Sequence, residues 1–87
     1  MLYSTRISKE DFELLCMIDK LLYLLEKGEE LCVKQNDEFI VKLFLMNDFF
    51  VELWYQPSTN KIKCLDVLDP VDVQLVYGNQ IDISDIF

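Results

Sequence analysis

Histidine is absent from this sequence of 87 residues. Histidine is the commonest general base in enzymes and the usual partner of a nucleophilic serine or cysteine. Its absence excludes Ser-His and Cys-His nucleophile pairs. Glycine is also scarce, and the two glycines, Gly28 and Gly78, are too far apart to form a glycine-rich phosphate-binding loop. We therefore expect a chain that is not an enzyme and binds no cofactor.

Cysteine is limited to Cys16, Cys32 and Cys64, an odd number at wide spacing. A zinc site needs four closely spaced Cys or His ligands, which this sequence lacks. Proteins that depend on a disulfide framework have more cysteines and fewer apolar residues than this chain. We expect buried, reduced thiols in a cytoplasmic protein without a metal. Residues 1–13 lack an apolar run ahead of their charges, and the apolar stretch 21–25 is too short to span a bilayer. The sequence thus predicts neither a signal peptide nor a membrane span.

Basic residues are few, since 8 Lys and Arg stand against 16 Asp and Glu, for a net charge of −8. Nucleic acids and anionic membranes attract basic surfaces, so we expect neither as a partner. Residues 68–87 hold four aspartates and no Lys or Arg. Solubility alone explains such acidity, and attraction to a basic protein is the alternative.

Apolar residues make up 52% of the chain, which is enough for a core, and the length predicts one domain over residues 1–87. The first predicted element is an amphipathic helix over residues 8–27. Ser8 suits its N-cap, Glu10 and Asp11 suit its first turn, and Gly28 follows as a stop signal. Its broad apolar stripe comprises Phe12, Leu14, Leu15, Ile18, Leu21, Leu22 and Leu25.

Strand candidates follow at residues 30–35, 39–46, 49–56 and 61–67, rich in β-branched and aromatic side chains. The first of these alternates only weakly, so the sheet has three or four strands. Turn residues separate the candidates, and all the loops are short. We predict an α+β fold in which the N-terminal helix packs on an antiparallel β-meander in chain order.

Loop lengths predict the register of the strands. We place two-residue turns at 36–37 and 47–48 and a four-residue turn at 57–60. The predicted neighbours are Val33 with Ile40, Val41 with Trp54, Leu43 with Glu52, Leu45 with Phe50, and Tyr55 with Ile62.

This register divides the strand side chains between two faces, and a bulge would exchange some of them. The first face, which we expect the helix to cover, holds Leu31, Val33, Ile40, Phe44, Met46, Phe49, Val51, Leu53, Tyr55, Ile62 and Cys64, with Lys42 as its long charge. The second face holds Cys32, Lys34, Val41, Leu43, Leu45, Phe50, Glu52, Trp54, Lys63, Leu65 and Val67.

Residues 69–87 allow two interpretations. Asp69 and Pro70 followed by Gly78 are typical of a short helix with its N-cap, first residue and stop. The alternation of Val71, Val73, Leu75 and Tyr77 is instead typical of a strand. We favour a short helix or turn followed by an extended tail, either of which can lie across the second face.

The second face is wide and apolar, and one short acidic segment covers little of it. Large exposed apolar patches normally mark interfaces, and two-fold pairs are the commonest oligomers. We therefore predict a homodimer in which sheet faces or edges meet. Its predicted interface residues are Leu43, Leu45, Phe50, Glu52, Trp54 and Leu65.

Glu52 is the residue of the second face with the most chemical interest. Burial beside Trp54 would raise the pKa of its carboxyl and suit it to acid or base work. The simpler interpretation is a cross-strand ion pair with Lys63, with Trp54 as an interface anchor.

Three functions are consistent with these features, and we favour the first. The first is a non-catalytic protein–protein interaction module that self-associates through an apolar sheet face. The second is an acidic inhibitor or immunity-type protein that binds a basic partner. The third is a small-ligand-binding protein with a pocket between helix and sheet.

Overall fold

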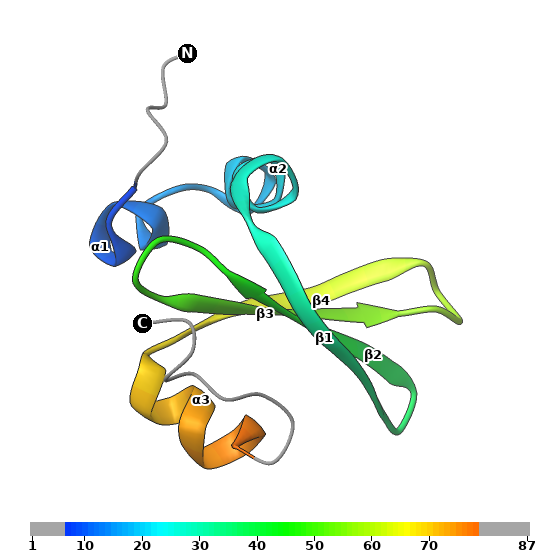
Figure 1. The fold of residues 1–87 in the computed structure, drawn as a ribbon. Helices are drawn as coiled ribbons and strands as arrows, with labels where there is room; N and C mark the ends of the chain where they lie inside the picture. Colours follow the sequence, from blue (N-terminus) through cyan, green and yellow to red (C-terminus); the bar gives the residue numbers. More distant parts are fainter. Residues whose placement is uncertain (1–6, 79–87) are drawn as a thin grey trace.

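The computed structural model describes residues 7–78 of the chain. Four strands form one antiparallel sheet in the order β1-β2-β3-β4, and three helices pack against it (Figure 1). The predicted α+β architecture with an antiparallel meander is confirmed. The elements are α1 (Lys9–Glu13), α2 (Met17–Lys27), β1 (Glu29–Asn36), β2 (Phe39–Leu45), β3 (Phe50–Gln56), β4 (Lys61–Leu68) and α3 (Pro70–Tyr77).

The N-terminal helix predicted over residues 8–27 is in fact two helices. The Ser8 hydroxyl accepts a hydrogen bond from the Asp11 backbone N–H at 3.0 Å and so caps α1. The chain then turns, and Cys16 takes an extended conformation at the N-cap of α2. In one continuous helix Phe12 and Tyr23 would lie about 16 Å apart along the axis. The break brings their ring centroids to 6.4 Å, so burial of Phe12 explains why the helix is interrupted.

The central hairpin has the predicted register. Leu45 lies opposite Phe50 and Leu43 opposite Glu52, and the Met46 N–H donates to the Phe49 carbonyl at 2.9 Å. The Tyr55–Ile62 pairing is also as predicted.

The turn between β1 and β2 lies at residues 37–38 and not at the predicted 36–37, because Asp37 takes the positive φ of 55°. Asn36 therefore pairs with Phe39. As a result, Val33 lies opposite Lys42 and not opposite Ile40.

Two bulges shift the outer strands against this central hairpin. One lies between Glu30 and Cys32 on β1, and the other adds Lys63 to β4 opposite the Trp54–Tyr55 step. A bulge moves the residues beyond it to the other face. The predicted faces are therefore wrong for four residues: Leu31 and Cys64 lie on the second face, and Leu65 and Val67 on the first.

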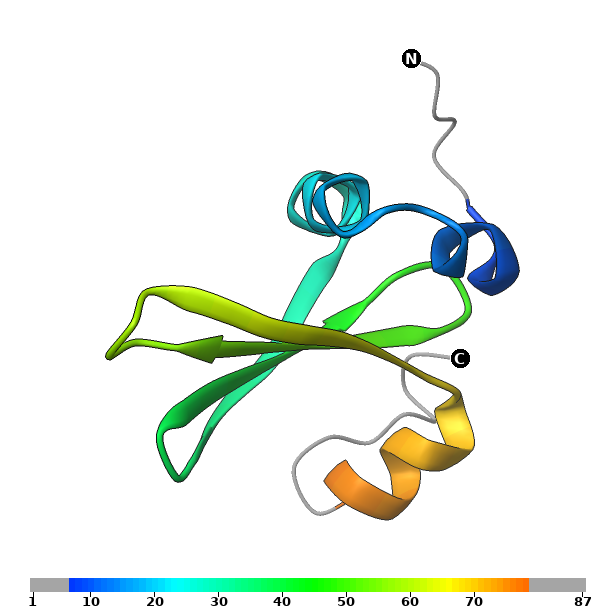
Figure 2. The ribbon, with the colours of Figure 1, turned by 180° about the vertical axis from the view of Figure 1, so that it is seen from behind.

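Helices cover both faces of the sheet. Both ribbon views place α1 and α2 on one side and α3 on the other (Figures 1 and 2). The first face carries the larger core, formed by Phe12, Tyr23, Leu24, Phe44, Phe49, Val51 and Leu53. The second face carries a smaller core, formed by Leu43, Phe50, Val73 and Tyr77.

The C-terminal segment begins with a helix, which decides between the two interpretations of that part of the sequence. Asp69 is the N-cap of α3, Pro70 is its first residue, and the side chains of Asp69 and Asp72 form a capping box. Lys9 Nζ lies 2.8 Å from Asp69 Oδ1 and joins the starts of α1 and α3. The predicted extended tail lies at residues 79–87, outside the described residues.

We predict that Phe12→Ala lowers the free energy of unfolding by about 3–5 kcal/mol, because Phe12 is fully buried against Tyr23 and Phe49. Leu14→Ala is the matched control, since Leu14 is 83% exposed two residues later, and it should change stability by less than about 0.5 kcal/mol. Urea titration followed by circular dichroism measures both. Equal losses in the two variants would contradict the placement of α1.

Candidate functional site

The six predicted interface residues do not share one exposed surface of the single chain. Leu43 and Phe50 are fully buried, and Glu52 is 8% exposed, because α3 packs over the middle of the second face. Leu45 is half-buried and packs against the same core. Trp54 is half-buried on this face, whereas Leu65 lies on the first face.

A carboxylate lies at the centre of the second face. Glu52 and Trp54 are two residues apart on β3, so their side chains point to the same side. Glu52 Oε1 accepts a hydrogen bond from Trp54 Nε1 at 3.1 Å, and Glu52 Oε2 accepts a hydrogen bond from the Tyr77 hydroxyl. Both carboxylate oxygens are thus occupied, and the arrangement anchors the last turn of α3 to the sheet. Sequence reasoning identified Glu52 with Trp54 and missed Tyr77.

The pKa values of three ionisable groups near this carboxylate are raised, so these groups keep their protons. Burial, and then the hydrogen bond to Glu52, raise the pKa of Tyr77. Burial also raises the pKa of the Cys32 and Cys64 thiols, so neither is an activated nucleophile. The prediction that all three thiols are buried is wrong for Cys16, which is exposed.

Lysines on the second face contact aromatic rings. Lys34 Nζ lies 4.5 Å from the centroid of the Tyr77 ring. Lys63 Nζ lies 4.7 Å from the Phe39 centroid and 5.8 Å from the Trp54 centroid. The strand partner of Glu52 on β4 is Asp66, so the anticipated Glu52–Lys63 pairing is not the observed register.

The outward side of α3 carries two large apolar side chains. Val73 and Tyr77 face the sheet, whereas Val71 is 69% and Leu75 79% exposed. These two residues are four apart and form a ridge, beside which Pro70 and Gln74 complete a shallow groove of about 290 Å³. A helix that is apolar around most of its circumference is normally covered around most of it. We call Val71 and Leu75 the α3 ridge.

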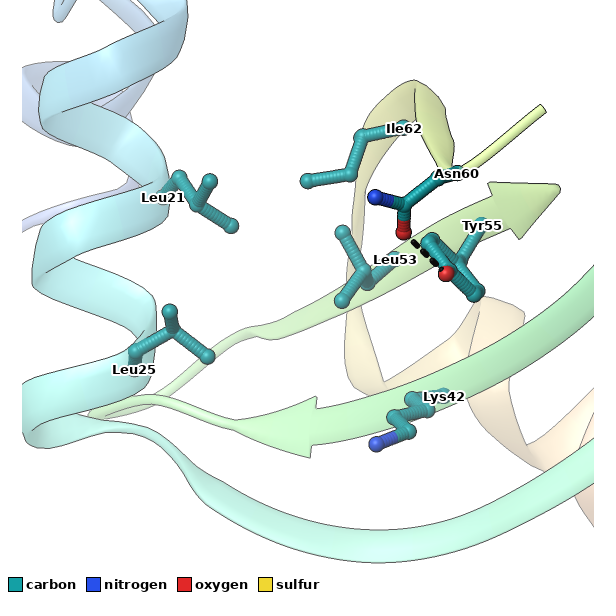
Figure 3. A pocket seen from close by; sticks show the side chains of 7 residues that line it. All are labelled: Leu21, Leu25, Lys42, Leu53, Tyr55, Asn60 and Ile62. Atoms are coloured by element: carbon teal, nitrogen blue, oxygen red, sulfur yellow. Dashed lines mark hydrogen bonds between the residues drawn. The ribbon is translucent and has the colours of Figure 1, made fainter. Parts of the chain in front are cut away.

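A second apolar hollow lies on the first face, between α2 and the far half of the sheet (Figure 3). Its volume is about 400 Å³. Leu21 and Leu25 point into it from α2 (Figure 3), and the Tyr55 hydroxyl donates a hydrogen bond to Asn60 Oδ1 at 2.5 Å at the opposite side. We call this hollow the α2 groove; its lining residues are Leu21, Leu25, Lys42, Leu53, Tyr55, Asn60 and Ile62.

The α2 groove continues onto an exposed flank of α2. Ile18, Leu22 and Leu25 are each more than 60% exposed, while Tyr23 and Leu24 on the adjacent side are buried. Only some residues of the broad apolar stripe predicted for the helix are therefore buried in the core.

The edges of the sheet are poorly suited to pairing with another strand. Each edge strand contains a bulge, and each carries charged residues, such as Glu30 on β1 and Lys61 and Lys63 on β4. Bulges and edge charges are the usual means of preventing edge-to-edge association. Neither edge strand is therefore a favourable site for the addition of another strand.

Two further observations bear on the kind of site present. Among residues 7–78, no three Asp, Glu or Cys side chains lie close enough together to hold a metal ion. Within the same residues, no helix is both long and apolar enough to cross a membrane.

We predict that Tyr77→Phe lowers the free energy of unfolding by about 1–3 kcal/mol at pH 7, because Glu52 loses a buried donor. The raised pKa of Tyr77 also has a pH signature. Above pH about 10 an unfolded tyrosine loses its proton while folded Tyr77 keeps it. The folded state then binds more protons, so wild-type stability falls as pH rises, by up to about 1.4 kcal/mol per pH unit.

Urea titrations of both proteins between pH 8 and pH 11 test this prediction. The difference between wild type and Tyr77→Phe should shrink above pH about 10, because phenylalanine has no proton to lose. Tyr55→Phe is the matched control, since Tyr55 is half-buried at the groove. A constant difference across the range would contradict the shifted pKa.

Comparison with known proteins gave no relative. No family model matches the sequence, and neither a curated protein nor a solved structure is significantly similar to it. The function is therefore inferred from the geometry of the described residues.

Proposed function

We propose that this chain is a non-catalytic protein–protein interaction module that forms a homodimer through the α3 ridge. The observation that carries the proposal is the exposure of Val71 and Leu75, 69% and 79%, on a short helix whose opposite side is buried. Covering such a ridge with a second apolar surface removes it from water, which is the main driving force of association.

The ridge consists of two side chains of similar size that could pair with a second copy. In a two-fold pair the same surface meets itself. A two-fold axis perpendicular to α3 would place the two copies of the helix antiparallel. Val71 of one copy then faces Leu75 of the other, and the contact is repeated by symmetry. The eight residues of α3 span about 12 Å, which is enough to present both ridge residues together.

The charges at the two ends of α3 support the same arrangement. Asp69 and Asp72 lie at its N-terminal end, whereas Lys34 lies against Tyr77 at its C-terminal end. The last turn of α3 has no basic residue of its own, so antiparallel pairing would bring the acidic first turn of one helix toward Lys34 of β1, which lies beside the last turn of the other helix. This pairing also aligns the two helix dipoles favourably. A single orientation therefore satisfies both the apolar and the charged groups.

This surface differs from the one predicted from the sequence, although it lies on the same side of the molecule. Leu43, Phe50 and Glu52 lie beneath α3 and hold it against the sheet. By fixing the position of α3, they also fix the position of the proposed contact residues. Trp54, half-buried on the same face, contributes through its hydrogen bond to Glu52.

We predict that wild type elutes as a dimer of twice the 10.3 kDa chain mass and that Leu75→Glu elutes as a folded monomer. A charge placed in the ridge must lose water when the helices meet, which opposes association. Leu22→Glu is the matched control, because Leu22 is similarly exposed on α2, on the other side of the sheet. Size-exclusion chromatography with light scattering measures the mass, and circular dichroism checks folding.

Two outcomes would overturn the proposal. One is a monomeric wild type at sub-millimolar concentration. The other is a dimer that Leu22→Glu dissociates and Leu75→Glu does not, which would move the contact to α2.

We predict that Lys34→Glu raises the dimer dissociation constant about 5- to 30-fold, because it places like charges together at both symmetric ends of the contact. Lys61→Glu makes the same change in charge at the far end of β4 and should have little effect. Sedimentation equilibrium at low and high salt measures both constants. Added salt should weaken the wild-type dimer and reduce the difference between wild type and Lys34→Glu. Equal constants for the two variants would argue against antiparallel helices.

A further inference from the structure

We propose that the α2 groove binds a single-chain amphiphile with a carboxylate head, of the medium-chain fatty acid type. The groove lies on the first face, whereas the α3 ridge lies on the second (Figures 1 and 3). Binding there is therefore independent of the proposed self-association.

The groove has the size and the lining of a small-ligand site. Its volume, about 400 Å³, falls within the range of about 300–1,000 Å³ found for such sites. Leu21 and Leu25 form one wall, and Leu53 and Ile62 extend from the sheet toward them (Figure 3). These four side chains provide an apolar channel for an alkyl chain.

The far side of the groove is polar and positively charged. Lys42 is the only charged residue of the lining, and its ammonium is 3.7 Å from Glu30, too far for a tight hydrogen bond. Its side chain remains 41% exposed. Lys42 contributes the charge of the lining, so an anionic head would compete with Glu30, the partner of Lys42 outside the lining, for this ammonium.

Asn60 provides a second group for the head. Its backbone has a positive φ of 58°, which fixes the residue at the end of the turn. Because its Oδ1 accepts from the Tyr55 hydroxyl, its amide nitrogen remains a donor, and that nitrogen is turned toward the α2 side (Figure 3). A carboxylate can thus accept from Lys42 or Asn60 while its chain runs toward α2.

The dimensions favour a small amphiphile over a partner helix. Leu21 and Leu25, the residues of α2 that line the groove, are one helical turn apart, about 6 Å. Helices bound in grooves use anchors over at least two turns. An alkyl chain that outgrows the groove meets Ile18 and Leu22 on the exposed flank of α2, so contact continues as the chain lengthens.

The test uses the full chain with octanoate, decanoate and dodecanoate, each below its micelle concentration, and with decanol as a neutral control. Full burial of one methylene group strengthens binding about fourfold. Because the groove is open, we expect about half of the surface of each methylene to be buried, so each added methylene should strengthen binding about twofold. Nitrogen–proton NMR spectra locate the site. Shifts are expected around Leu25, Lys42 and Asn60 and not around Val71 and Leu75.

Matched variants separate the head from the chain. Lys42→Gln should weaken decanoate about 10-fold and leave decanol unchanged. Lys61→Gln, on the exposed β3–β4 hairpin, should change neither. Leu25→Gln should weaken both ligands, since it alters the wall of the groove and not the head site. Leu25 is 61% exposed, so this variant should fold.

Three outcomes would overturn the proposal. These are no shifts at the groove with dodecanoate, equal affinity for decanoate and decanol, or an affinity that does not depend on chain length. A monomeric wild type would contradict the proposed dimer and leave this inference intact, so the two failures are distinguishable.

Discussion

The fold depends on covering a sheet that is apolar on both faces, and the hydrogen bond from Tyr77 to Glu52 secures the cover of the second face. Glu52 is buried at 8% exposure, and its two oxygens accept from Trp54 and Tyr77. A buried carboxylate without donors is strongly unfavourable, so these bonds fix where α3 must lie. The position of α3 then determines which apolar side chains remain outside. The hydrogen bond between Tyr77 and Glu52 therefore also determines which apolar side chains are exposed.

Sequence patterns predicted the parts of the structure that local geometry determines. The two-residue loop at 47–48 fixed the pairs Leu45–Phe50 and Leu43–Glu52, because loop length sets register in a hairpin. The helix signals of Asp69 and Pro70 were likewise local. Bulges were not predictable, because they depend on how whole strands twist against the helices. They explain why Leu65, expected in the interface, lies on the opposite face.

The candidate sites were harder to predict because they depend on which apolar residues the core leaves unused. The break at Cys16 has no glycine or proline to signal it, and it follows from the burial of Phe12. That break directs Tyr23 and Leu24 inward and leaves Leu22 and Leu25 outside. The partner of Glu52 was missed for a similar reason. Tyr77 is 25 residues from Glu52 in the chain and contacts it only because α3 packs across the sheet.

The ion pair between Lys9 and Asp69 has a consequence for the entropy of loop closure on folding. The sheet contacts join neighbouring strands through short loops, whereas this pair joins residues 60 positions apart. Closing so long a loop is entropically expensive, and it becomes less so once the intervening chain is compact. The pair also links helices on opposite faces, so it spans the end of the sheet. The meander therefore requires the least loop closure, and the contact between the two ends of the described chain requires the most.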